Sequence, residues 1–415
     1  MSDLDLTKIK KVFFIGIGGI GISALAQMLF NNGISVSGVT DEEGKAVDVL
    51  RELGINVLIS KTVFGIAEAD LYVYSDAWLY RGPEIIAQAR NTGKLVLSYF
   101  EALGEISKKY KVIAISGTHG KTTTSAMVAE MLLDAGLDPT VIVGSFVKRF
   151  GSNFKKGNSE YLVVEADEFN RHMLFFKPYI GAITNIEADH LDVYKDLNDI
   201  KSAFEKFLAQ SENKIVDYSK YLDKVPELLV PGEHNRKNAA LALAVADVLG
   251  INEEISKKSL ASFSGTWRRL EKRGVTEKGT IVYDDYAHHP TEVKASLQAL
   301  RELYPRGTKV ITVVFQPHLY SRTKDFFKEF SEAFDDADNV ILLPIYFARE
   351  DPDPSVSSDK LAEAICLHRG EAVAFKDFAD AEAYVRGINL EGKDVFVTMG
   401  AGEAYKVADN VLKFK

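Results

Sequence analysis

A glycine-rich loop in the middle of the chain sets the strongest limit on its fold. The loop, Gly117-Thr118-His119-Gly120-Lys121-Thr122-Thr123, stands directly between an apolar run that predicts a strand at 112–116 and a stretch that predicts a helix. Such a loop presents backbone N–H groups and the positive end of the helix dipole to phosphate oxygens. Lys121 would add charge at the terminal phosphates, and Thr122 a hydroxyl ligand for Mg²⁺. Ile115 occupies the first glycine position of the general P-loop pattern, but the context favours a nucleotide site over an incidental glycine turn.

A second glycine turn, GIGGIG, lies between a strand expected at 11–15 and a helix expected at 22–30. Its glycines, Gly16, Gly18, Gly19 and Gly21, fit the G-x-G-x-x-G pattern that lets a diphosphate approach a helix N-terminus. Asp41 or Glu42, after the next strand, could hold the ribose of NAD. A dehydrogenase therefore stays open for this region alone, as does a purely structural turn.

Apolar runs alternating with helical stretches predict three α/β regions along the chain. The expected strands are 11–15, 36–39, 56–59, 71–74 and 95–97 in the first region, 112–116, 161–164 and 180–184 in the second, and 281–283, 309–314, 340–343 and 395–398 in the third. A lysine pair at 108–109 and a polar stretch at 262–273 mark the junctions, and an alanine-rich helix is expected at 238–249. We therefore expect domains at 1–108, 109–266 and 267–415.

Composition narrows the class of protein and its surroundings. A chain of 415 residues with 46% apolar and 26% charged residues predicts a folded globular protein of two to three domains. The net charge of −9 argues against nucleic acid as a partner. The single cysteine, Cys366, favours a reducing cytoplasm, and no run is long and apolar enough to predict a membrane span. Glycines interrupt the apolar stretch near the N-terminus, which argues against an export signal.

Acidic residues follow two strands of the second region. Glu165-Ala166-Asp167-Glu168 follows the strand at 161–164, and Asn185-Ile186-Glu187-Ala188-Asp189-His190 follows the strand at 180–184. Ligands of open α/β sheets bind beyond the carboxyl ends of the strands. Glu165 is therefore a candidate Mg²⁺ ligand and His190 a candidate ligand of a second metal, whereas Asp167 and Glu168 could equally form a solvated acidic turn.

Histidines and an arginine follow strands of the third region in the same way. Asp284-Asp285-Tyr286-Ala287-His288-His289-Pro290 follows one strand, and Gln316-Pro317-His318 with Ser321-Arg322-Thr323 follows another. Arg322 could bind a carboxylate with two parallel hydrogen bonds. Either cluster alone could be a capped helix start, but their recurrence favours a substrate site.

Nine motifs in order resemble those of the Mur ligases, and the resemblance covers nearly the whole chain. The motifs are FIGIGGIG, GTHGKTTT, EADE, TNIEADHLD, PGEHNRKNAA, RRLE, DDYAHHPTE, FQPHLYSRT and TMGAGE. The resemblance implies an α/β protein with an N-terminal Rossmann-like domain for a UDP-sugar, a central P-loop ATPase and a C-terminal Rossmann-like domain. It is strongest to the members that add L-alanine. The implied reaction joins L-alanine to the lactyl carboxylate of UDP-N-acetylmuramate through an acyl phosphate, with ATP and Mg²⁺.

The resemblance also implies roles for individual residues. Lys121 and Thr122 would hold ATP phosphates and Mg²⁺, within a loop that contributes Gly117, Thr118, His119, Gly120 and Thr123 to ATP binding. The implied metal ligands are Thr122, Glu165 and His190. Further ATP contacts would come from His234, Asn238, Arg269 and Asp285. The UDP-sugar would meet Gly16, Gly18, Gly19, Gly21 and Ser75, and the amino acid would meet Tyr286, His288, His318 and Arg322. The protein would act as a monomer or homodimer in the cytoplasm.

Some positions depart from the family or separate its members. Leu319 stands where many members carry arginine, and the segment between Gln210 and Pro231 is shorter than usual. Phe204 stands where later ligases of the pathway carry a carbamylated lysine, which favours the alanine-adding type. The ligase that recycles a tripeptide onto the same sugar is the runner-up. An NAD-dependent oxidoreductase would leave GTHGKTTT unexplained, and a non-catalytic relative would be expected to have lost Lys121, Glu165 or His190.

Overall fold

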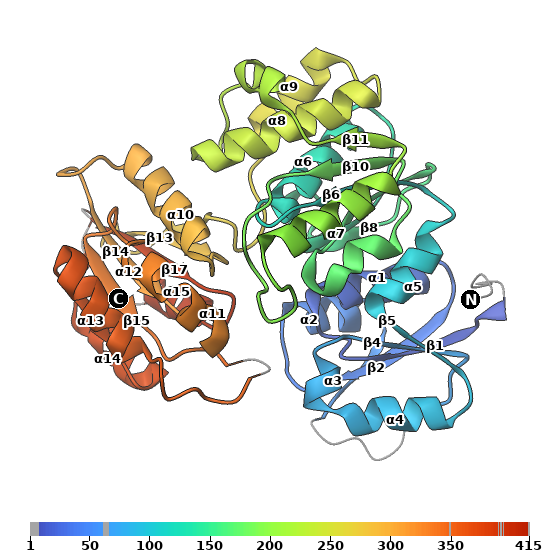
Figure 1. The fold of residues 1–415 in the computed structure, drawn as a ribbon, viewed down its shortest axis with the longest axis horizontal. Helices are drawn as coiled ribbons and strands as arrows, with labels where there is room; N and C mark the ends of the chain where they lie inside the picture. Colours follow the sequence, from blue (N-terminus) through green and yellow to red (C-terminus); the bar gives the residue numbers. More distant parts are fainter. Residues whose placement is uncertain are drawn as a thin grey trace. The chain divides into compact units, whose positions relative to one another are not determined.

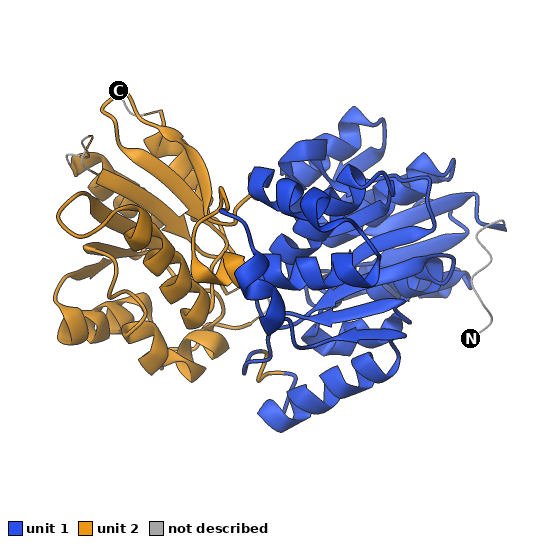
Figure 2. Cartoon of the chain, turned by 90° about the horizontal axis from the view of Figure 1, so that it is seen from above, with its two compact units in different colours: residues 1–189, 193–227, 238–263 blue, residues 190–192, 228–237, 264–415 orange. Residues whose placement is uncertain are grey.

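The computed structural model describes residues 8–60, 66–347, 350–388, 390, 392 and 394–413. Three β-sheets, each flanked by helices, form the chain (Figure 1). The chain divides into two compact units (Figure 2). The first unit comprises residues 1–189, 193–227 and 238–263 and holds two of the sheets, and the second comprises 190–192, 228–237 and 264–415 and holds the third. Each unit is described by itself.

The first sheet has five parallel strands in the order β3-β2-β1-β4-β5. Its strands are β1 (Lys11–Ile15), β2 (Ser35–Thr40), β3 (Asn56–Ile59), β4 (Leu71–Tyr74) and β5 (Leu95–Ser98). Its helices are α1 (Ile20–Asn31), α2 (Lys45–Glu52), α3 (Trp78–Arg81), α4 (Pro83–Asn91) and α5 (Tyr99–Ser107). Ser98 and Glu101 form a capping box that starts α5 directly after β5. The parallel order places the ends of β1 and β4 side by side.

The second sheet has six strands in the order β11-β10-β6-β9-β7-β8, and β8 is antiparallel to β7. Its strands are β6 (Lys111–Ser116), β7 (Thr140–Val147), β8 (Ser152–Lys155), β9 (Tyr161–Glu165), β10 (Ile180–Ile183) and β11 (Asn213–Ile215). Its α-helices are α6 (Lys121–Asp134), α7 (Leu197–Ala209), α8 (Glu233–Val248) and α9 (Glu253–Ser262). Three 3₁₀ segments are η2 (Lys148–Phe150), η3 (Phe169–Phe175) and η4 (Ser219–Lys224). The central strand β6 leads straight into the glycine loop and α6.

The two sheets of the first unit share one apolar core and a buried polar link. Core residues of both sheets pack together, among them Leu25 of α1 and Phe154 of β8. Within this contact the amide of Gln27 donates to Asn153 Oδ1 at 2.9 Å, and the amide of Asn153 donates to Ser23 Oγ at 3.0 Å. Buried polar groups need such partners, so α1 is held against β8 by both packing and hydrogen bonds.

The third sheet has six strands in the order β12-β13-β17-β14-β15-β16, and only β12 is antiparallel to its neighbour among the pairs described. Its strands are β12 (Glu271–Val275), β13 (Ile281–Asp285), β14 (Val310–Phe315), β15 (Asn339–Leu342), β16 (Ala372–Ala374) and β17 (Asp394–Met399). Its helices are α10 (Pro290–Leu303), α11 (Tyr320–Asp325), α12 (Phe327–Ser331), α13 (Ser358–Arg369), α14 (Phe378–Gly387) and α15 (Tyr405–Val411). Helices on both faces bury it, which explains the apolar runs of its central strands.

The α/β class and three-part architecture expected from the sequence are confirmed. The expected junction at 108–109 falls between α5 and β6, and the junction at 266–267 falls between α9 and β12. The second unit also takes short segments at 190–192 and 228–237 from the middle of the chain, which contiguous domains would not include. Among the described residues, no helix has the length and apolar character needed to cross a bilayer.

Candidate functional site

The first glycine turn is shaped by close packing. Gly16 has φ +85°, and a Cβ on it would lie 2.4 Å from Trp78 Cδ1 and 3.1 Å from Ser75 Cβ. A Cβ on Gly18 would lie 2.7 Å from Thr40 Oγ1, and one on Gly21 would lie 3.0 Å from the ring of Tyr99. The protein's own packing therefore disfavours a side chain at Gly16 and Gly18 and leaves little room for one at Gly21, with or without a ligand.

The turn also ends in a helix start suited to an anion. Helix α1 has Gly19 as its N-cap, with no side-chain cap and no acidic residue in its first turn. Its dipole would favour a negatively charged group there. Asp41, which could have bound a ribose, lies 3.0 Å from Arg81 Nη1 in an ion pair. An acid engaged in this way is less suited to the ribose contact that an NAD site requires.

The loop between β6 and α6 is held from the neighbouring strand β10. Thr118 N donates to Asn185 O at 3.0 Å, His119 N donates to Asn185 Oδ1 at 3.0 Å, and Thr184 Oγ1 donates to His119 O at 2.6 Å. The sequence alone assigns no individual role to Thr184 or Asn185. Both anchor the loop backbone, which fixes the path along which phosphates would lie.

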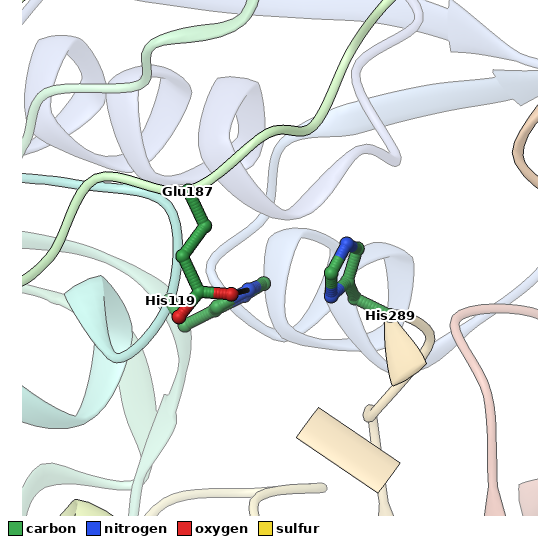
Figure 3. Close-up of side chains that lie close together, drawn as sticks. All are labelled: His119, Glu187 and His289. Carbon is green, nitrogen blue, oxygen red and sulfur yellow. Dashed lines mark ion pairs between the residues drawn. The ribbon is translucent and has the colours of Figure 1, made fainter. Parts of the chain in front are cut away.

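Glycines are needed at both ends of this loop. Gly117 has φ +129°, and a Cβ on it would lie 2.0 Å from Thr184 Oγ1. Gly120 has φ +84°, and a Cβ on it would lie 2.3 Å from Asn238 Oδ1. Asn238, an expected ATP contact, thus lies directly against the loop. His119, in the same loop, lies near Glu187, with 3.6 Å between His119 Nε2 and Glu187 Oε2 (Figure 3).

Lys121 begins α6 and points into a group of oxygens. Its Nζ donates to Gly117 O at 2.7 Å and to Thr118 O at 3.1 Å, and it lies 2.6 Å from Glu168 Oε2 and 4.0 Å from Asp167 Oδ1. Burial opposes protonation of Lys121, but the carboxylates outweigh burial, so the pKa of Lys121 is raised above its ordinary value. The loop lysine is therefore charged and held beside the glycine loop.

Thr122 and Glu165, two of the expected metal ligands, lie together. Thr122 Oγ1 donates to Glu165 Oε2 at 3.0 Å, and Gly144 N donates to the other carboxylate oxygen. A hydroxyl and a carboxylate are hard oxygen ligands of the kind Mg²⁺ prefers. Their place at the start of α6 and the end of β9 fits a metal beside the loop. His190, the other expected ligand, has φ +54° and belongs to the second unit, so its role stays a prediction.

Four expected substrate residues of the second unit form one connected group. His288 Nδ1 lies 2.9 Å from Tyr286 O, the rings of His288 and His318 have centroids 5.8 Å apart, and Arg322 Nη1 lies 3.3 Å from His318 Nδ1. Tyr346 stacks on His318 with centroids 5.6 Å apart. Sequence reasoning missed Tyr346, which comes from the loop after β15 and follows no motif. The group comes from β13, β14 and β15, whose ends share one edge of the sheet.

Leu319 is buried, and its backbone is hydrogen-bonded to Tyr346 of this group. It is 2% exposed and adopts φ 70° and ψ 135°, a backbone conformation that non-glycine residues rarely adopt. Its N–H donates to Tyr346 O at 2.8 Å. An arginine at 319 in the place of this buried side chain would have to bury its charge.

Of the residues expected near ATP in the second unit, Asp285 is buried, whereas His234 and Arg269 are partly exposed. Asp285 is 5% exposed and accepts a hydrogen bond from the Ser296 hydroxyl, and burial raises its pKa to about 6. Burial lowers the pKa of His234 to about 4. Arg269 lies over the ring of Tyr286, with its guanidinium carbon 5.0 Å from the ring centroid. Shifted pKa values such as those of Asp285 and His234 cluster at functional sites.

The adjacent arginine, Arg268, has a different part in the same unit. It is 4% exposed, and its Nε donates to Asp284 Oδ2 at 2.9 Å. Its Nη1 donates to Gly402 O at 3.1 Å, and its Nη2 donates to Gly400 O. Arg268 therefore ties the end of β13 to the loop after β17. The sequence motif RRLE did not reveal which of its two arginines is buried.

Comparisons with known proteins agree with this arrangement. Three family models match: the Mur ligase family catalytic domain over residues 11–111, the Mur ligase middle domain over 115–219 and the Mur ligase glutamate ligase domain over 268–402. A curated UDP-N-acetylmuramate–L-alanine ligase of Acetivibrio thermocellus is 38% identical, over 100% of this chain and 98% of that protein. One from Clostridium kluyveri is 39% identical over 98% of each. The first alignment spans 467 positions, more than the 415 residues of this chain, so that relative carries segments that this chain lacks.

Solved structures show the same fold. The structure of a UDP-N-acetylmuramate-alanine ligase from Thermotoga maritima matches with a TM-score of 0.82 and 28% identity, over 97% of this chain and 98% of that one. A murein peptide ligase from Psychrobacter arcticus matches with a TM-score of 0.69 at 20% identity, over 97% and 98%, which supports the fold alone. Matches to models of all three parts, and relatives above 30% identity over almost the full length, establish that the chain belongs to the Mur ligase family.

Proposed function

We propose that this protein is an ATP-dependent ligase that joins L-alanine to UDP-N-acetylmuramate. The observation that carries the proposal is the full-length likeness to curated ligases of that name, at 38% and 39% identity. The arrangement of Lys121, Thr122 and Glu165 around the loop supports the ATP half of the reaction. The cytoplasm is the expected compartment, because the chemistry consumes ATP.

The proposed reaction has two steps. A lactyl carboxylate oxygen attacks the γ-phosphorus of ATP, the bond to ADP breaks, and an acyl phosphate forms. The neutral amine of the amino acid then attacks the acyl carbon, the C–O bond to phosphate breaks, and an amide, phosphate and a proton result. Charge spread over the transferring phosphoryl oxygens must be neutralised. Lys121 would supply a fixed positive charge for this, and Mg²⁺ held by Thr122 and Glu165 would supply further charge neutralisation.

We assign a substrate to each part of the chain. Residues 1–108 would bind the UDP-sugar, with its diphosphate at the glycine turn and Ser75 beside it. Residues 109–266 would bind ATP, with Asn238 against the loop and His234 nearby in sequence. Residues 267–415 would bind the amino acid through Tyr286, His288, His318 and Arg322, while Arg269 and Asp285 would reach ATP. His190 would ligate a second metal.

Phosphate release tests the proposal. The purified protein is mixed with UDP-N-acetylmuramate, ATP and Mg²⁺, and L-alanine, glycine, L-serine or the tripeptide L-alanyl-D-glutamyl-diaminopimelate is supplied in turn. We expect the highest kcat/KM with L-alanine. A preference for the tripeptide would identify the recycling reaction instead, and no phosphate release with any acceptor would refute the ligase proposal.

Calorimetry tests the first domain separately. We expect UDP-N-acetylmuramate to bind without ATP, because the glycine turn and α1 need no second nucleotide, and we expect NAD not to bind. Binding of NAD without binding of the UDP-sugar would overturn the assignment of residues 1–108.

A further inference from the structure

A buried histidine lies between two carboxylates from different sheets of the first unit. His172, in η3, is 5% exposed. Its Nε2 lies 2.7 Å from Asp76 Oδ2, in the loop after β4, and its Nδ1 lies 3.7 Å from Asp167 Oδ2, in the loop after β9. Neither the glycine motifs nor the strand-end motifs include this histidine. His172 thus forms ion pairs with both loops.

Each carboxylate also lies next to a residue of one of the proposed substrate sites. Asp76 follows Ser75, which packs against Gly16 of the first glycine turn. Asp167 presents its other carboxylate oxygen to Lys121, with 4.0 Å between Oδ1 and Nζ. The backbone links Ser75 to Asp76, and side-chain contacts then run from Asp76 through His172 and Asp167 to Lys121.

The ring of His172 is held in one orientation. It stacks on Phe100 of α5, with centroids 4.0 Å apart and 16° between the planes, and it meets Phe169 edge-on at 5.8 Å. Opposing burial, both carboxylates raise the pKa of His172 to about 9, so the ring is charged at neutral pH. A charged ring clamped between aromatic side chains can fix two carboxylates at once.

We infer that His172 is a positioning residue for the proposed ligase reaction. It fixes the position of the loop that contains Ser75 and Asp76, beside the UDP-sugar, relative to the loop that carries Lys121. The inference rests on the proposed function, because the reaction requires the sugar's carboxylate and the γ-phosphate of ATP to meet at reacting distance. Displacements of about 1 Å can cost roughly 100-fold in rate. His172 would act on the alignment of the two substrates, and each substrate would still bind by itself.

Kinetics and binding together test this role. His172→Phe keeps the aromatic stacking and removes both polar contacts. We expect its kcat to fall about 10- to 100-fold, while calorimetric Kd values for UDP-N-acetylmuramate alone and for ATP alone change less than about 3-fold. His368, whose Nε2 lies 3.0 Å from Asp335 on the surface of the second unit, gives the matched control, and His368→Phe should keep the wild-type kcat. A folded His172→Phe protein with wild-type kcat would overturn the inference.

A double-mutant cycle guards against misfolding of that variant. Asp76→Asn keeps the size and an acceptor oxygen but removes the charge, and His172→Gln keeps a donor. If the pair acts as a unit, the double variant should lose little more kcat than the worse single variant. Independent losses that multiply would overturn the inference. The thermal unfolding of the same four proteins measures the coupling between Asp76 and His172 without substrates. Additive changes in the free energy of unfolding would count against the pairing. A wild-type protein that is inactive on UDP-N-acetylmuramate would instead count against the proposed function.

Discussion

Replacing Arg268 by alanine should destabilise the second compact unit far more than replacing its neighbour Arg269. Arg268 is 4% exposed and makes hydrogen bonds to Asp284, Gly400 and Gly402. Arg269 is partly exposed, and its Nη1 lies 4.0 Å from Glu292 Oε1. Two adjacent arginines in one motif therefore provide a variant and its control.

The size of the effect follows from Asp284, which is 0% exposed. Burial raises the pKa of Asp284, and Arg268 opposes that rise. Arg268→Ala would leave this carboxylate buried without its charged partner and would leave two carbonyls without their donor. Breaking a buried ion pair on one side costs about 3–5 kcal/mol. Arg269→Ala should cost less than about 1 kcal/mol and should mainly raise the KM for ATP.

Tryptophan fluorescence can follow this unit alone. The chain has two tryptophans, Trp78 in the first unit and Trp267 in the second. In a Trp78→Phe background, urea unfolding followed at Trp267 should show a midpoint lowered by roughly 1–3 M in Arg268→Ala. Adding Asp284→Asn should recover about 1 kcal/mol or more, because a neutral amide is cheaper to bury. Equal effects of Arg268→Ala and Arg269→Ala would refute the reasoning.

Three further substitutions test separate parts of the account. Lys121→Ala should lower the rate of phosphate release at least about 100-fold, because the loop loses its charge at the phosphates. Lys109 is exposed, and Lys109→Ala should leave that rate unchanged. A Lys121→Ala variant with the wild-type rate would refute the assignment of the loop to ATP. Arg322→Ala should raise the KM for the amino acid roughly 10- to 150-fold, which corresponds to the loss of a charge-assisted hydrogen-bonded pair of about 1.5–3 kcal/mol. The KM for ATP should stay nearly unchanged, and Arg306→Ala, on the surface, is the control. An unchanged KM for the amino acid would mean that another residue binds the carboxylate of the amino acid. Glu130 is 6% exposed, and burial raises its pKa to about 7. The folded protein therefore holds a proton that the unfolded chain releases, and the free energy of unfolding should fall as pH rises from 4.5, the ordinary pKa of the group, to about 7. Glu130→Gln should therefore raise the unfolding free energy at pH 8.5 by about 1–3 kcal/mol and change it little at pH 4.5, whereas exposed Glu84→Gln should be neutral at both; a destabilised Glu130→Gln at pH 8.5 would contradict this.

The central strands and both glycine turns could be predicted because their signals are local. Apolar runs such as 112–116 and 395–398 are buried on both faces, so they stand out from the helical stretches around them. The eight-residue strand β7, Thr140–Val147, was missed. Gly144 interrupts its apolar run, and the structure gives the reason, since a Cβ there would lie 2.8 Å from Glu165 Oε2. The edge strand β12, Glu271–Val275, was missed because its EKRGV sequence lacks apolar alternation.

Contacts between distant residues could not be predicted from patterns. Because the carboxyl ends of parallel strands meet at one edge of a sheet, the sequence predicts that Tyr286, His288, His318 and Arg322 lie at that edge. The structure confirms that these four residues lie together. The same rule could not show that Asn185 anchors the glycine loop, that Tyr346 stacks on His318, or that His172 meets Asp76 from 96 residues away. The first two pairs depend on which strands are neighbours in a sheet, and the third depends on how two sheets pack. Periodicity and motif spacing encode neither.

Oxygen transfer tests the acyl phosphate most directly. UDP-N-acetylmuramate labelled with ¹⁸O in both carboxylate oxygens is turned over with ATP, Mg²⁺ and L-alanine, and the phosphate and amide products are analysed by mass spectrometry. Because a carboxylate oxygen bonds to the γ-phosphorus and leaves with it, each phosphate should carry one ¹⁸O, and the amide should retain the other. Phosphate without ¹⁸O would contradict the proposed reaction.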